Sequence, residues 1–136
     1  MRPFAIAGCL FAATLLAGCS GPSSEPTRYR VSGEATFNGN PIPYGDVLFT
    51  PDGANAGPQG IADIRDGKYD TAAARGKGIA GGPTVVRVTG LSGPPPGGKL
   101  LCEYEYRVEL PREDTTHKVE VPPEGAAGNQ VKPPEI

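Results

Sequence analysis

Polar and apolar residues alternate along much of this chain between residues 28 and 121. The alternation is most regular from residue 102 to residue 110, where five apolar residues alternate with charged ones. The apolar set is Cys102, Tyr104, Tyr106, Val108 and Leu110, and the charged set is Glu103, Glu105, Arg107 and Glu109. A period of two puts successive side chains on opposite faces of an extended chain, so it predicts a half-buried β-strand. No stretch shows the period of 3.6 that is typical of an amphipathic helix, which predicts an all-β domain.

Turn residues divide the pattern into about seven strands. The other predicted strands cover residues 28–37, 46–50, 60–65, 68–71, 84–89 and 115–121. Asn38-Gly39 and Asp66-Gly67 are dipeptides that favour tight hairpin turns. Seven short strands separated by such turns predict a single antiparallel β-sandwich, with an open barrel as the other candidate. The longest connections, residues 52–59, 72–83 and 90–99, are where we expect any specific recognition.

The N-terminus carries a different pattern. Arg2 precedes a run without charge from Phe4 to Leu16, which is shorter than the roughly 20 apolar residues that a membrane-spanning helix needs. Its length is typical of a signal peptide. The sequence Leu16-Ala17-Gly18-Cys19 that ends it resembles the lipobox of bacterial lipoproteins. The alternative is an ordinary secretory signal that happens to end near a cysteine.

The lipobox resemblance implies that the thiol of Cys19 receives a diacylglycerol and that cleavage follows between Gly18 and Cys19. We therefore expect residues 1–18 to be the signal peptide and residues 19–27 a lipidated, flexible tether. Residues 28–121 form the predicted domain, and the Pro/Gly-rich residues 122–136 form a predicted disordered tail. The expected location is the cell envelope, with the lipid in a membrane and the domain in the periplasm or at the cell surface.

Composition narrows the possible partners. The chain has 13 Lys and Arg, 15 Asp and Glu, and a formal net charge of −2. A mildly acidic chain without a basic cluster argues against nucleic acid as a partner. Of the three cysteines, the lipobox resemblance implies that Cys9 leaves with the signal peptide and that Cys19 carries the lipid. Cys102 is then the one remaining thiol, so no disulfide within the domain is expected.

The run from Tyr29 to Pro51 is similar to the opening of transthyretin-like and carboxypeptidase-regulatory-like domains. The matching positions are Val31, Gly33, Gly39, Pro41 and Ile42, together with the later Asp66-Gly67-Lys68-Tyr69. With the lipobox, the whole also resembles small lipoproteins of planctomycetes. The resemblance implies an immunoglobulin-like sandwich with an accessory, non-catalytic role. The chain has one histidine and ends in Pro-Pro-Glu-Ile, so the activity of transthyretin-like hydrolases is not expected.

Two residues could in principle carry catalysis. His117 follows Asp114, Thr115 and Thr116, but catalysis needs a nucleophile or an orienting carboxylate at the ring. We interpret His117 as a histidine at a strand end, with one ring nitrogen bonded to backbone. Cys102 has acidic neighbours, which disfavour a thiolate, and we interpret it as a small buried apolar residue.

The remaining candidates concern binding. Asp63, Asp66 and Asp70 faintly resemble a calcium loop, but their spacing differs from the EF-hand pattern; we expect a hairpin whose charge is neutralised by Arg65 and Lys68. Tyr104 and Tyr106 could stack on sugar rings, although their phase predicts a place in the core. The charged face of residues 103–109 is expected to pair with arginines on neighbouring strands, of which Arg28, Arg30 and Arg87 are the candidates.

Together these patterns predict a lipid-anchored envelope protein that is not an enzyme and has a structural or protein-interaction role. Its expected partners are the membrane and possible envelope proteins or polysaccharide, and no cofactor is expected apart from the lipid on Cys19. The alternative is a module that binds carbohydrate or a metal ion through the loops at one end of the sandwich.

Overall fold

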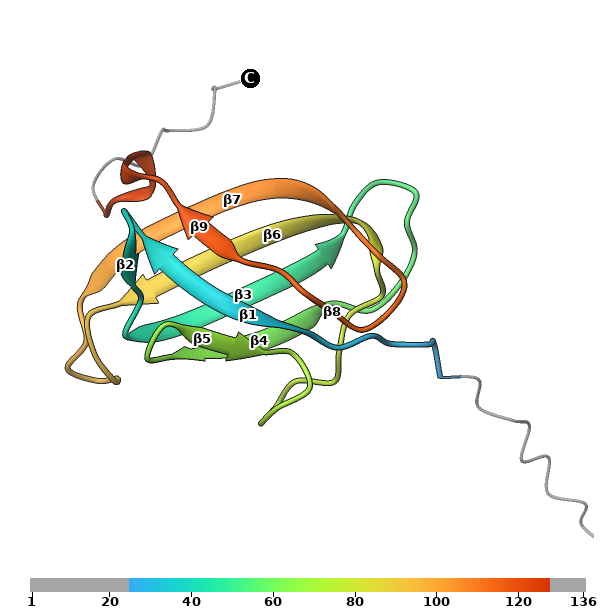
Figure 1. The fold of residues 1–136 in the computed structure, drawn as a ribbon, viewed down its shortest axis with the longest axis horizontal. Coiled ribbons are helices and arrows are strands. Elements are labelled where there is room, and N and C mark those ends of the chain that lie inside the picture. Colours follow the sequence, from blue (N-terminus) through green and yellow to red (C-terminus); the bar gives the residue numbers. More distant parts are fainter. Residues whose placement is uncertain (1–24, 128–136) are drawn as a thin grey trace, which may run out of the picture.

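A computed structural model describes residues 25–127 as an all-β domain (Figure 1). The predicted signal peptide, its Leu16–Cys19 segment and the end of the predicted tail lie outside the described residues. The strands are β1 (Val31–Phe37), β2 (Asn40–Pro41), β3 (Tyr44–Pro51), β4 (Gly60–Arg65), β5 (Lys68–Asp70), β6 (Gly82–Leu91), β7 (Leu100–Leu110), β8 (Thr115–Thr116) and β9 (Val119–Val121). A single turn of 3-10 helix, η1 (Pro123–Gly125), follows them. No helix within residues 25–127 has the length and apolar character needed to cross a membrane.

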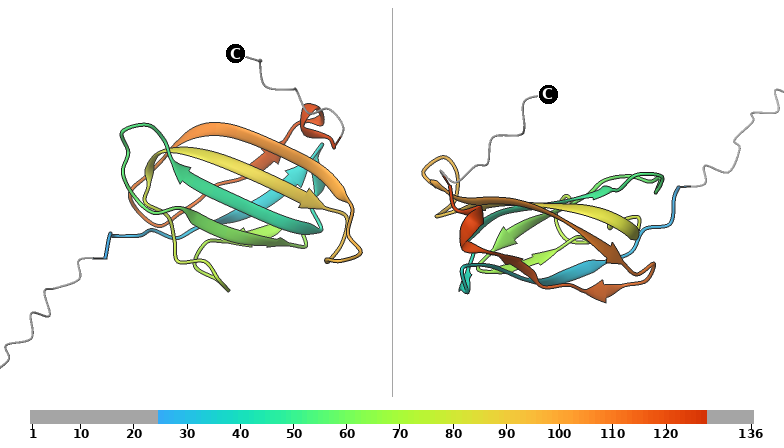
Figure 2. Two further views of the ribbon diagram at one scale, coloured as in Figure 1. Left: turned by 180° about the vertical axis from the view of Figure 1, so that it is seen from behind. Right: turned by 90° about the horizontal axis from the view of Figure 1, so that it is seen from above.

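The strands form one sheet that curls into a half-barrel (Figures 1 and 2). Its order is β2-β1-β5-β4-β3-β6-β7, and all these neighbours pair antiparallel. β8 and β9 pair with β1 in parallel. The described chain therefore enters at one end of the half-barrel and leaves near the other (Figure 1).

Both predicted hairpin turns are confirmed. Asn38 and Gly39 have φ values of 48° and 80°, and Asp66 and Gly67 have φ values of 51° and 74°. Positive φ at both central residues matches the right-handed twist of the strands that such a turn joins. The Asp66-Gly67 turn joins β4 to β5, whereas the Asn38-Gly39 turn leads only into the two-residue β2.

The predicted strand at residues 115–121 is interrupted. β8 and β9 keep one register along β1, but His117 and Lys118 between them belong to neither strand, although the His117 amide still donates to the Ser32 carbonyl oxygen at 3.0 Å. Gly33 lies opposite this break, and a Cβ atom at Gly33 would lie 2.3 Å from the carbonyl oxygen of His117. The missing side chain of Gly33 thus lets the final strand approach β1 closely at this point.

The concave side of the half-barrel holds the core. Its fully enclosed members include Val31, Ile42, Val47, Phe49, Ile64, Ile79, Val86, Val88, Cys102 and Val119. The expected burial of Cys102 is confirmed, because its exposed fraction is 0%. The rings of Tyr104 and Tyr106 pack against this core and are only partly buried. The prediction that these side chains point inward is therefore also confirmed.

The ordered chain continues beyond the predicted domain boundary at residue 121. η1 brings Ala126 beside β7, where it forms a bridge with Cys102, and the Ala127 amide donates to the Leu101 carbonyl oxygen at 2.9 Å. Gly125 is buried at this turn, where a Cβ atom would lie 2.5 Å from a methyl group of Val121. Residues 122–127 therefore pack on the sheet, unlike the disordered tail that the prolines of this segment predicted.

Candidate functional site

An open groove of about 580 Å³ lies over the outer side of β1, β5 and β4. One wall is the start of the loop that follows β5. The lining residues are Ser32, Gly33, Glu34, Asp63, Arg65, Lys68, Tyr69, Asp70, Ala73 and Ala74. The groove therefore lies on a face of the sheet, beside the predicted recognition loop at residues 72–83, and not at the end of a sandwich.

The charges around this groove are not paired as the sequence predicted. Asp63 forms an ion pair with Arg75 at 2.8 Å, and Asp70 binds Arg30. Arg65 and Lys68 are direct cross-strand neighbours, and neither forms an ion pair within residues 25–127. The prediction that Arg65 and Lys68 neutralise the aspartates is therefore wrong, and these two cations remain available on the groove.

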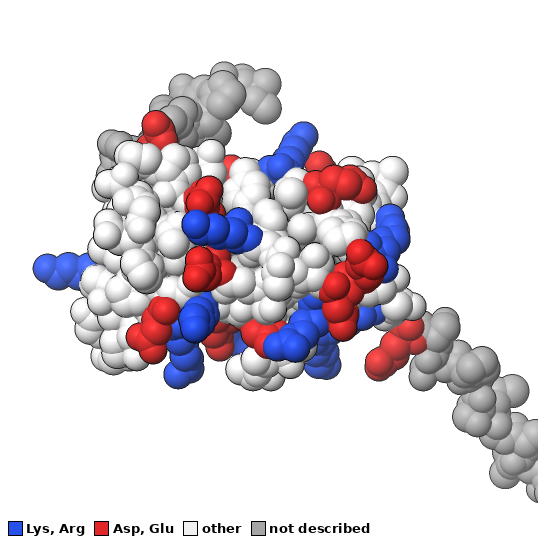
Figure 3. Space-filling model, in the orientation of Figure 1, with Lys and Arg blue, Asp and Glu red and all other residues white. Residues whose placement is uncertain are grey.

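The three candidate metal ligands do not converge. Asp66 lies in the β4–β5 turn, while Asp63 and Asp70 each face an arginine. Within the described part of the chain, no three His, Cys, Asp or Glu side chains are grouped so that they could hold a metal ion. Figure 3 shows acidic and basic side chains interspersed across the face that it displays.

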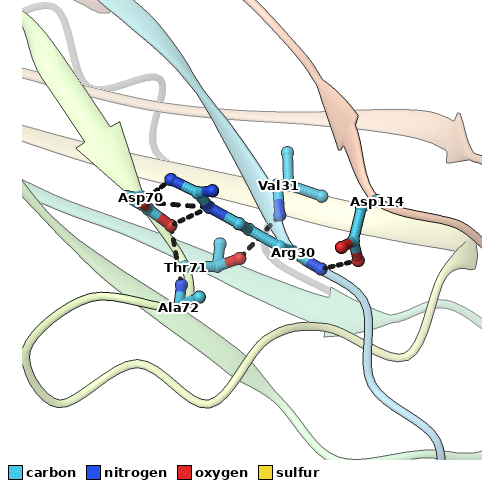
Figure 4. A network of polar contacts seen from close by, with 6 residues as sticks. All are labelled: Arg30, Val31, Asp70, Thr71, Ala72 and Asp114. Carbon is cyan, nitrogen blue, oxygen red and sulfur yellow. Dashed lines mark hydrogen bonds and ion pairs between the residues drawn. The ribbon is translucent and has the colours of Figure 1, made fainter.

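A polar network fixes the wall of the groove to β1 (Figure 4). The carboxylate of Asp70 accepts hydrogen bonds from the Arg30 guanidinium at 3.1 Å and from the Ala72 amide at 2.9 Å. Arg30 holds the pKa of Asp70 below its usual value. The Thr71 hydroxyl accepts from the buried Val31 amide at 2.8 Å, and the Asp114 carboxylate accepts from the Arg30 amide at 2.8 Å. Segments distant in sequence are thereby joined at one end of β1.

Thr71→Val is expected to lower the free energy of unfolding by about 1–3 kcal/mol, because it leaves the buried Val31 amide without an acceptor. Urea denaturation checks the value. Thr71→Ser keeps the hydroxyl and is the matched control, with a smaller loss expected. Equal losses in the two variants would show that the hydroxyl bond contributes nothing.

A second cluster lies where the last strands approach β7. The Tyr106 hydroxyl and the His117 Nε2 atom are 2.8 Å apart, and the Tyr69 hydroxyl donates to the His117 carbonyl oxygen at 2.5 Å. The ring centroids of Tyr106 and His117 are 6.1 Å apart. Burial lowers the pKa of His117 and raises that of Tyr106 to about 12. The ring of His117 is therefore held by a hydroxyl group, so the expected bond from the ring to backbone is wrong.

The residues that precede His117 in the sequence bind groups other than its ring. Asp114 accepts from the Arg30 amide, and the Thr115 hydroxyl donates to the Thr116 carbonyl oxygen at 3.5 Å. The ring partner that the structure gives His117 is Tyr106. This arrangement holds the imidazole of His117 beside β7 through the hydroxyl group of Tyr106.

The depressed pKa of His117 gives the protein a specific pH dependence. In the unfolded chain the imidazole has an ordinary pKa near 6.5, so on acidification the unfolded state takes up a proton before the folded state does. The free energy of unfolding is therefore expected to fall as pH drops from about 7.5 through 6.5, and to level off below the folded-state pKa.

Urea titrations at a series of pH values check this dependence. His117→Gln, which cannot titrate, should flatten the curve in this window. An identical slope in the variant and the original chain would assign the pH dependence to other groups.

The outer face of β7 carries the charged residues predicted for it. Arg87 forms an ion pair with Glu103, as expected for neighbouring strands. The other two expected arginines are elsewhere: Arg30 binds Asp70, and the Arg28 guanidinium donates to the carbonyl oxygens of Gln59 and Gly78 at 3.4 Å. That part of the predicted cross-strand pairing is wrong, because Arg28 and Arg30 precede β1, and β1 is not a neighbour of β7 in the sheet.

Sequence reasoning missed the groove and its fixed wall. Thr71 gave no signal beyond its position after a predicted strand, and its role depends on a contact with a residue 40 positions away. Tyr69 could have been found, since it lies opposite Gly33 on the paired strand and alternation directs its ring inward.

In comparisons with known proteins, no family model, curated protein or solved structure matched this chain. The similarity to transthyretin-like domains and to planctomycete lipoproteins thus stays a prediction from the sequence motifs.

Proposed function

We propose that this protein is a lipid-anchored component of a bacterial cell envelope, whose domain is a non-catalytic module for protein interaction. The anchor rests on the sequence Leu16-Ala17-Gly18-Cys19 after an uncharged run. The interaction role rests on one observation: β7, with 11 residues, ends the sheet and has no partner strand along most of its outer edge within residues 25–127. Such an edge offers unpaired backbone donors and acceptors to another chain.

We also propose that the half-barrel is a distorted sandwich of the transthyretin-like or immunoglobulin-like kind. Support comes from the arrangement in Figures 1 and 2, where β1 and β9 lie across the core from β3 and β6. The two hairpin turns with positive φ at both central residues, Asn38-Gly39 and Asp66-Gly67, contain glycines of the motifs that carry the resemblance.

Metabolic labelling with a fatty-acid probe tests the anchor. The full chain should incorporate the probe and sediment with membranes, whereas Cys19→Ser should lose both properties because the acceptor thiol is absent. Cys102→Ser is the matched control: it removes a buried thiol and should leave the labelling intact. Continued labelling of Cys19→Ser would refute the lipidation site.

A second candidate function is the binding of an acidic saccharide in the groove of β1, β5 and β4. It is favoured by Arg65 and Lys68, which line the groove and form no ion pair within residues 25–127. Titration with a uronic acid oligomer, followed by NMR shifts of the groove residues, tests this function. The double variant Arg65→Ser/Lys68→Ser should abolish the shifts, and shifts that persist in it would contradict a role for these cations.

A further inference from the structure

The outer edge of β7 is open over its second half. Ala126 bridges to Cys102 and the Ala127 amide reaches the Leu101 carbonyl oxygen, so the chain's own C-terminal segment covers only the beginning of this edge. Alternation along an antiparallel strand then directs the backbone groups of Glu105 and Arg107 to the same outer side as those of Leu101. Among residues 25–127, no other strand pairs with β7 here.

The charged side chains along this stretch are exposed to solvent. Glu105 is exposed and forms no ion pair in the described part of the chain. The Arg107 side chain is 78% exposed, and its closest acidic contact is Asp52 at 3.6 Å. On the inner face, Tyr104, Tyr106 and Val108 pack against the core but stay only partly buried. The edge therefore presents one exposed charge of each sign beside an apolar row.

We propose that this edge pairs antiparallel with the same edge of a second copy of the chain, about a two-fold axis at Tyr106. In this register Glu105 of each copy lies opposite Arg107 of the other. Both residues direct backbone groups outward, so they form the hydrogen-bonded pairs of the ladder. The inner face then stacks Tyr106 on its own copy and places Tyr104 opposite Val108, which are favourable aromatic and aromatic–aliphatic cross-strand pairs.

Shifted registers are less favourable. An axis at Glu105 places the two Glu105 side chains together, and an axis at Arg107 places the two Arg107 side chains together and Glu105 opposite Glu109. Directly opposed like charges destabilise a ladder. The register centred on Tyr106 is the one in which both exposed charges meet opposite charges, so charge complementarity favours a symmetric pair of identical chains.

This inference rests on the proposed function, because the lipid anchor would confine the copies to one membrane and raise their effective concentration. A contact of about five residues on each side is small, so in solution we expect a weak dimer that forms only at high protein concentration. Confinement to a surface can make such a weak contact effective. The pairing would join the sheets of the two copies through β7 of each.

Charge reversal on the full chain tests the pairing. In sedimentation velocity at rising protein concentration, Glu105→Arg and Arg107→Glu should each weaken dimerisation about tenfold, because two opposite pairs become like-charge pairs. The double variant Glu105→Arg/Arg107→Glu should restore it. Glu34→Arg on β1 makes the same charge change away from β7 and should have no effect. A chain that is monomeric at all concentrations, or a double variant that stays monomeric, overturns the proposal.

Cysteine crosslinking on membranes tests the register itself. Glu105→Cys and Arg107→Cys chains with different tags, expressed together, should form a disulfide between the tags, because Cα atoms in hydrogen-bonded pairs lie about 5.5 Å apart. Glu105→Cys paired with Glu34→Cys should not. If the chain sediments with membranes and takes up the lipid probe but does not crosslink, the pairing fails and the anchor stands. If it fails to take up the probe, the anchor fails whatever the outcome of the crosslinking.

Discussion

Gly45→Ala is expected to lower the free energy of unfolding by about 3 kcal/mol or more. Gly45 has a φ of 151° and pairs with Gly90 in the centre of the sheet. A Cβ atom at this position would lie 2.0 Å from the Thr89 carbonyl oxygen and 3.1 Å from the Gly90 Cα atom. Because the obstructing atoms are backbone, the clash is relieved only when β3 and β6 separate locally.

Urea denaturation followed by circular dichroism measures this loss. Gly97→Ala is the matched control: Gly97 has no positive φ, and no heavy atom lies within 4 Å of its built Cβ position, so we expect a change within about 0.5 kcal/mol. Two variants of equal stability would mean that β3 and β6 are not held together at Gly45 as the structure shows.

Phe49→Ala is expected to cost about 3–5 kcal/mol, the usual loss when a buried aromatic ring is truncated. Phe49 is 1% exposed, and its ring centroid lies 6.0 Å from that of Tyr69. The cavity would open between β3 and β5, on opposite sides of β4. This loss is a large part of the stability of a domain of this size, so part of the population should be unfolded without denaturant.

Thermal unfolding monitored by near-ultraviolet circular dichroism checks the Phe49 variant. Leu100→Ala removes an apolar side chain that is 43% exposed and should cost less than about 1 kcal/mol. A melting curve for Phe49→Ala that superimposes on that of Leu100→Ala would contradict the central place of Phe49 in the core.

The local features of the fold could be predicted because short-range rules determine them. Strand alternation depends on the two faces of each strand, and the Asn38-Gly39 and Asp66-Gly67 turns depend on the φ values that these residues tolerate. Strand order could not be predicted, since it is decided by packing between distant segments. β2 illustrates the limit: a strong turn dipeptide was recognised, but the partner strand after it has two residues.

The candidate sites could be predicted from the sequence less well than the strands could. The bond between Tyr69 and the His117 carbonyl oxygen joins residues 48 positions apart, and neither residue type identifies the other. The aspartates of the groove were recognised as charges, but Arg30 and Arg75 reach them from segments that the turn motif did not include. The open edge of β7 followed only from knowing that β7 ends the sheet.

The parallel pairing of β1 with β8 and β9 has a consequence for the order of events during synthesis. Arg30 and Asp114, which are bonded at the end of this pairing, are 84 residues apart. β1 can pair with β2 and β5 earlier, but its parallel partners β8 and β9 are made only after nearly the whole domain. Contacts so distant in sequence slow folding. The side of β1 that β8 and β9 cover should therefore stay exposed in a nascent chain until its last strands emerge.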